Sequence, residues 1–161
     1  MINRNSFLRF ILICLLGIIY PSFKSLNEEK KLSKILILGD SISIGYFPFI
    51  EKLLVGKAHI RRPMLPNGGF ENCGGTSKAL KHIYNWIGET NWDLIHFNFG
   101  LHDIKHVNPI NGKNSNSFND PHQASPKQYA DNLEKIVEIL KKTGAKLIFA
   151  TTTPYPNSKL K

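Results

Sequence analysis

The sequence feature that most constrains the fold is an apolar run within residues 34–39, which is followed directly by Asp40 and Ser41. A strand made almost entirely of apolar residues is typical of a parallel sheet that is covered on both faces. Strand-like and helix-like segments alternate along the rest of the chain. In order they are a helix at 46–55, a strand at 58–62, a helix at 76–87, a strand at 92–99, a helix between Ser125 and Gly144, and a strand at 145–151. This alternation predicts βαβ units and therefore an α/β fold with a parallel sheet.

The start of the last helix carries the clearest local signal. Ser125-Pro126-Lys127-Gln128 has the pattern of a capping box with proline at the first helical position. A serine side chain at such a position accepts a hydrogen bond from the backbone three residues later. The sequence therefore predicts that Ser125 caps this helix.

The first part of the chain has the pattern of a targeting segment. Arg4 and Arg9 precede an uncharged apolar stretch at residues 10–23. This stretch is shorter than the roughly 18–20 residues that span a bilayer as a helix. It predicts a secretory signal peptide over residues 1–25, or an uncleaved anchor, with export to the periplasm or the extracellular space. Residues 26–33 form a charged linker and residues 34–161 form the folded domain.

The charge balance narrows the choice of partners. The chain has 21 Lys+Arg against 12 Asp+Glu, for a formal net charge of +9. The lysines are scattered and no basic run is interleaved with aromatic residues, which argues against nucleic-acid binding. Membrane contact is expected only through the N-terminal segment, if that segment is not cleaved.

The cysteine count and the absence of two nucleotide-binding motifs exclude several other classes of protein. Cys14 lies in the targeting segment, which leaves Cys73 alone, so no disulfide framework is expected. The sequence has neither Gly-Lys-Ser/Thr nor Gly-x-Gly-x-x-Gly, so a P-loop and a dinucleotide fold are excluded. Neither a metal nor an organic cofactor is implied by the remaining residues.

Ser41 stands where a parallel sheet concentrates its chemistry. Functional loops of such sheets lie at the carboxyl ends of the strands, and Ser41 follows the first strand directly. If a helix begins there, its free N–H groups can stabilise an anion beside the hydroxyl. The local pattern supports equally well a second interpretation, in which Asp40 or Ser41 merely caps the helix.

Four segments in order resemble the sequence blocks of the SGNH (GDSL-type) serine hydrolases. Residues 34–44 resemble block I, residues 71–77 block II, residues 98–103 block III, and residues 149–154 the strand and loop that follow. The resemblance implies a flavodoxin-like three-layer α/β/α sandwich. It also implies that a serine attacks an ester carbonyl while a histidine takes its proton.

The resemblance assigns roles to individual residues. Ser41 would be the nucleophile, and the oxyanion hole would be formed by the N–H groups of Ser41 and Gly75, with Gly74 as an alternative, and by the His102 side chain. Asp40 and Asp103 would have supporting roles.

His102 stands where the family usually has asparagine. An imidazole can donate one N–H if its tautomer is fixed, and Asp103 is the neighbour expected to fix it. The alternative is that His102 only packs in or turns the loop.

The general base is the family feature that this sequence lacks. It belongs to an Asp-x-x-His near the C-terminus, whereas the printed sequence stops at Lys161, shortly after the fourth strand. Asp103-Ile-Lys-His106 spells the same pattern but lies within block III, so we do not expect His106 to be the base. We therefore expect a fold that is incomplete at its C-terminus, with an exposed sheet edge and an uncovered apolar face.

These observations rank the candidate functions. The first is an exported serine esterase that hydrolyses a small ester, with an O-acetyl group on a carbohydrate as the expected substrate. The main rival is a truncated inactive form or a binding pseudoenzyme that keeps the pocket. A flavodoxin-like nucleotide binder comes last, because no phosphate loop is present.

Overall fold

The computed structural model describes residues 31–152, which contain one four-stranded sheet with parallel strands in the order β2-β1-β3-β4. The elements are β1 (Ser33–Leu38), α2 (Ser41–Leu53), β2 (Ala58–Arg61), α3 (Thr76–Ile87), β3 (Leu94–Phe97), α4 (Pro126–Lys141) and β4 (Lys146–Phe149). The targeting segment at 1–25, most of the linker and the end of the domain, 153–161, lie outside the described residues.

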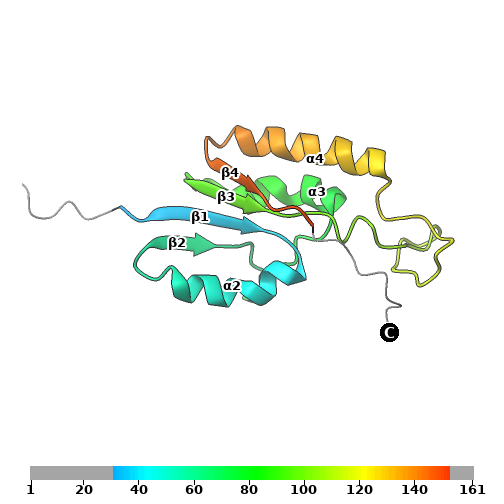
Figure 1. Cartoon of the computed structure of the whole chain (residues 1–161), viewed down its shortest axis with the longest axis horizontal. Coiled ribbons are helices and arrows are strands. Elements are labelled where there is room, and N and C mark those ends of the chain that lie inside the picture. Colours follow the sequence, from blue (N-terminus) through cyan, green and yellow to red (C-terminus); the bar gives the residue numbers. More distant parts are fainter. Residues whose placement is uncertain (1–30, 153–161) are drawn as a thin grey trace, which may run out of the picture. The chain divides into compact units, whose positions relative to one another are not determined.

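Helices cover the sheet from both sides, which gives three layers (Figure 1). Helix α2 lies on one face, whereas α3 and α4 pack against each other on the opposite face. The larger core, between the sheet and the α3–α4 pair, includes Leu36, Ile83, Phe97 and Ile136, each of which is almost completely buried. A smaller core of Ile37, Phe47 and Ile60 lies under α2. The α/β fold and the parallel sheet predicted from the sequence are confirmed.

Local signals explain most of the element boundaries. Ser125 accepts a hydrogen bond from the Gln128 amide at 3.1 Å, so α4 is capped as predicted. Helix α3 spans the predicted residues 76–87. Helix α2 begins at Ser41, well before its predicted start at residue 46, because the Asp40 side chain accepts from the Ile42 amide at 3.0 Å and caps it.

One edge of the sheet and part of its α2 face are open among the described residues. Strand β4 is an edge strand, with Ile148 and Phe149 exposed to 41% and 39%. On the α2 side, a cavity of about 430 Å³ lies over the sheet, and most of its lining is aliphatic. Within residues 31–152, β4 is thus paired on one side only, and the α2 face of the sheet is only partly filled. No helix in this part of the chain is long and apolar enough to cross a membrane.

Candidate active site

Three segments meet at the carboxyl edge of the sheet. The turn after β1 is joined to the segment before α3 by a hydrogen bond from the Cys73 amide to the Gly39 carbonyl, 3.1 Å long. The segment after β3 is joined to the end of β1 by a bond from the Asn98 amide to the Leu38 carbonyl, 3.0 Å long. These three segments carry Ser41, Gly75 and His102. The fold therefore brings together the three segments that resemble blocks I, II and III.

Ser41 is the first residue of α2 and is exposed, whereas Asp40 is only 4% exposed. The cap of this helix is Asp40, so the capping interpretation holds for that residue and not for Ser41. No hydrogen bond to the Ser41 hydroxyl is found within residues 31–152. The hydroxyl is therefore accessible, next to the positive end of the helix dipole.

Of the two glycines, Gly75 is the better candidate for an oxyanion donor. The Gly74 amide already donates to the Asn72 side chain, at 2.8 Å, and Gly74 adopts a φ of +65°. Gly75 is the N-cap residue of α3, and no acceptor for its amide is found among the described residues. A free amide at a helix N-terminus is well suited to bind developing negative charge.

Asp103 is buried against Gly75 and caps α3 from a distant part of the chain. It is 2% exposed and accepts from the Thr76 amide at 2.9 Å and from the Thr76 hydroxyl at 2.6 Å. A Cβ atom on Gly75 would lie 3.0 Å from the Asp103 carboxylate, so only glycine fits there without displacing the cap. The expectation that Asp103 fixes the tautomer of His102 is wrong in the described structure: its carboxylate binds Thr76, and no hydrogen bond to His102 is found.

His102 lies in the turn after β3, close to the glycine pair. Its Nδ1 would be 3.9 Å from a Cβ atom built on Gly74. Burial lowers the pKa of His102, and the positive charge of Lys105 lowers it further. The negative charge of Asp40 acts in the opposite direction and raises this pKa, but by less. The imidazole is therefore neutral near neutral pH, with one N–H to donate and one nitrogen to accept.

His106 is held inside the surface loop and is not directed at Ser41 by any described contact. Its Nδ1 is hydrogen-bonded to the Asp120 carbonyl at 2.5 Å, and its ring stacks on that of His122 with centroids 4.5 Å apart. The Nδ1 atom of His122 contacts the Ile104 carbonyl at 2.6 Å. These contacts give both histidines a role in shaping the loop.

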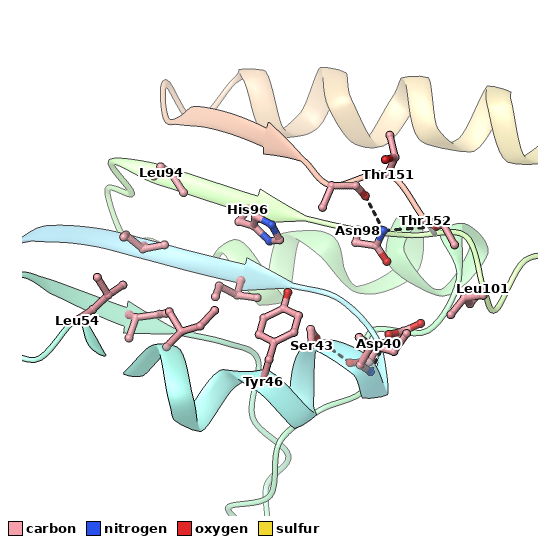
Figure 2. Close-up of a pocket in the computed structure, with 16 residues that line it drawn as sticks. Asp40, Ser43, Tyr46, Leu54, Leu94, His96, Asn98, Leu101, Thr151 and Thr152 are labelled. Atoms are coloured by element: carbon pink, nitrogen blue, oxygen red, sulfur yellow. Dashed lines mark hydrogen bonds between the residues drawn. The ribbon is translucent and has the colours of Figure 1, made fainter. Parts of the chain in front are cut away.

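The cavity on the α2 side of the sheet reaches the residues next to Ser41 and extends along the sheet, but Ser41, Gly75 and His102 do not line it (Figure 2). Asp40 and Ser43 lie at its carboxyl-edge end, while His96 and Tyr46 line it further along. Asn98 donates to the Ala150 carbonyl at 2.5 Å and so joins the ends of β3 and β4 beside the cavity. Within the described residues, no group of three or more His, Cys, Asp or Glu side chains is arranged to hold a metal ion.

Sequence reasoning missed Arg62, whose guanidinium is buried directly under the turn that carries Ser41. It is 4% exposed and donates to the Ser43 hydroxyl at 3.0 Å. The available signal was a charged residue between a short strand and Pro63. That signal is weak, because arginines at strand ends are usually solvated.

Comparison with known proteins yields one informative likeness. No protein-family model and no curated protein sequence matches the chain. Among solved structures, the fold is similar to the crystal structure of an acetyl xylan esterase, AlAXEase, with a TM-score of 0.52 and 13% sequence identity. The match covers 72% of this chain and 56% of that one, so this chain spans about half the length of that esterase. At this identity the likeness establishes a shared α/β fold.

Proposed function

We propose that this protein is a serine esterase of the SGNH type, with Ser41 as nucleophile. The observation that carries the proposal is the pairing of two helix N-termini at one edge of the sheet. Ser41 begins α2 and Gly75 precedes α3, and the bond from Cys73 to Gly39 ties their segments together. Amide groups at two helix N-termini beside an exposed hydroxyl suit the attack of that hydroxyl on a carbonyl carbon.

The chemistry follows from these groups. The Ser41 hydroxyl loses its proton to a base and adds to the ester carbonyl, and the oxygen of that carbonyl becomes negative. The amides of Ser41 and Gly75 and the N–H of neutral His102 donate to this oxyanion. The tetrahedral intermediate collapses, the alcohol leaves with a proton, and water then releases the acid from the acyl-serine.

A general base is not assigned to any residue in the described part of the chain, where no histidine is hydrogen-bonded to Ser41. The test is therefore designed around Ser41 itself. The protein is assayed on a small acetyl ester with and without added imidazole, which supplies an external base. The parent protein is compared with Ser41→Ala and with Ser117→Ala, a serine on the surface loop that serves as the matched control.

The expected result is turnover that is raised by imidazole, is unchanged in Ser117→Ala and is absent from Ser41→Ala above the reaction of imidazole alone. Equal rates for the parent and Ser41→Ala would refute the nucleophile assignment. No turnover combined with saturable binding of an acetylated sugar would favour the alternative, a binding module that keeps the pocket.

The role of His102 has its own test. Loss of one oxyanion donor lowers kcat by about 10²–10³-fold in other serine hydrolases. We expect a loss of this size in His102→Leu and much smaller loss in His102→Asn, because the amide side chain also offers an N–H. Equal losses in both variants would show that His102 packs the loop instead.

The finer assignment is an exported enzyme that removes O-acetyl groups from a carbohydrate. It is supported by the similarity of the fold to an acetyl xylan esterase and by the signal-like pattern of residues 1–25. Acetylated oligosaccharides should be better substrates than esters of longer acids. Export to the periplasm or outside the cell is tested by locating the expressed protein and measuring the mass of its mature form.

A further inference from the structure

Arg62 carries a buried positive charge that no acidic side chain neutralises by direct contact in residues 31–152. It follows β2 and is almost completely buried. The guanidinium lies over the rings of Phe47 and Phe70, with centroid distances of 5.7 and 5.4 Å. Burying an arginine is unfavourable unless its N–H groups find acceptors, so the acceptors that Arg62 contacts indicate what the side chain does here.

The guanidinium connects the turn after β1 to the segment before α3. One nitrogen, Nη1, donates to the Ser43 hydroxyl at 3.0 Å. The other, Nη2, donates to the Gly39 carbonyl at 3.3 Å and to the Glu71 carbonyl at 3.0 Å. Ser43 in turn donates to the carbonyl of Asp40 at 2.7 Å. A single planar group thus holds both sides of the turn that carries the nucleophile.

Each end of this bridge leads to one of the two proposed backbone donors. Gly39 and Ser43 flank Ser41, while Glu71 starts the segment that runs to Gly75. In the described structure, the two segments are also joined by one direct backbone hydrogen bond, from the Cys73 amide to the Gly39 carbonyl. One hydrogen bond leaves the segments free to rotate about it, whereas the added fork of Arg62 fixes both their distance and their angle.

We propose that Arg62 is a positioning residue that holds the Ser41 and Gly75 amides at the separation needed to share one oxyanion; its catalytic consequence rests on the proposed function. Small displacements of such donors are costly, since a misplacement of about 1 Å can lower a rate about 10²-fold. The fork geometry, and not the charge alone, is what the three acceptors require. Lysine has a single nitrogen on a flexible stem and cannot replace it.

The test compares Arg62→Lys and Arg62→Met with Arg61→Met, a neighbouring arginine that is exposed. Two measurements are made on the full chain: amide hydrogen exchange by peptide, and kcat and KM for a small acetyl ester with imidazole present. We expect faster exchange at residues 39–43 and 71–75 in both Arg62 variants, with exchange in β3 and α4 unchanged. We also expect kcat to fall about 10²-fold in both, with KM within about threefold, and no effect of Arg61→Met.

The outcomes separate the positioning role from the proposed function. If the parent protein shows no Ser41-dependent turnover, the esterase proposal fails and the exchange data alone decide the role of Arg62. Exchange that rises uniformly over the sheet, or stays as in the parent, overturns the positioning role. Full kcat in Arg62→Lys also overturns it, because charge without the fork would then suffice. If Arg62→Met does not fold, Arg62→Lys carries the same comparison, since it retains the buried charge.

Discussion

Replacing Asp103 with alanine is the most direct test of how the candidate site is held together. The carboxylate accepts from both the amide and the hydroxyl of Thr76, and it is the cap of α3 although it lies far along the chain. Loss of a helix cap costs about 0.5–2 kcal/mol. A buried hydrogen bond to a charged group contributes about 1.5–3 kcal/mol. The Thr76 hydroxyl would still accept from the Asn132 side chain, at 3.2 Å, but its own O–H would lose its acceptor. We therefore expect Asp103→Ala to lower the free energy of unfolding by about 3 kcal/mol.

Urea denaturation followed by tryptophan fluorescence measures this loss, because Trp86, in α3, and Trp92, in the segment that follows it, both lie in the core. For a domain of this size, 3 kcal/mol corresponds to a fall in Tm of roughly 10–15 °C. Asp103→Asn, which keeps the shape and one acceptor oxygen, should lose less than half as much. Asp131→Ala is the control, since Asp131 forms only an exposed ion pair with Lys127 and should have no measurable effect. A free energy of unfolding for Asp103→Ala within about 0.5 kcal/mol of the parent, at an unchanged m value, would refute the reasoning.

The other predictions concern a glycine, a thiol and a histidine. Gly45→Ala in α2 should raise the free energy of unfolding by about 0.5–1 kcal/mol in a denaturant titration, because a Cβ atom there meets nothing within 4 Å; Gly75→Ala should lower it, because its Cβ atom would crowd Asp103. Burial raises the pKa of the Cys73 thiol to about 11, so iodoacetamide at pH 8 should label it only as fast as the protein unfolds, and rapid labelling of the folded protein would contradict this. Burial lowers the pKa of His96, so the unfolded state takes up its proton first and stability should fall as the pH drops below about 6.5. His96→Leu also removes a buried Nδ1 that has no partner in residues 31–152, and its gain in stability should be larger at pH 5 than at pH 8.

Several parts of the fold could be predicted because their signals are local in the sequence. The apolar run of β1 requires burial on both faces, and the order of strands and helices requires parallel pairing. The capping box at Ser125 and the periodicity of α3 set the limits of two helices within a few neighbouring residues. The sequence also predicted that Ser41 would follow a buried strand at the sheet edge, because the carboxyl ends of parallel strands share one edge.

The early start of α2 shows where prediction from the local sequence pattern fails. Its first turn, from Ser41, has few apolar residues facing the core, so the hydrophobic periodicity becomes visible only further along. The start is decided instead by the side chain of Asp40, which accepts a hydrogen bond from the Ile42 amide. Whether Asp40 or Ser41 takes the cap was open in the sequence, because either side chain can accept a hydrogen bond from a backbone amide two or three residues later.

Tertiary structure alone decided how the site is supported, because the deciding contacts join residues that are far apart in the chain. Asp103 binds Thr76 in preference to its neighbour His102, Arg62 reaches three acceptors in two segments, and Asn98 binds the carbonyl at the end of β4. No local pattern encodes these pairings: each depends on which buried polar groups the packed core leaves without water, and a buried donor must take whichever acceptor lies within its reach. The sequence by itself thus determined the order of the elements and the edge at which Ser41 lies, while the packed fold determined which side chains hold that edge in shape.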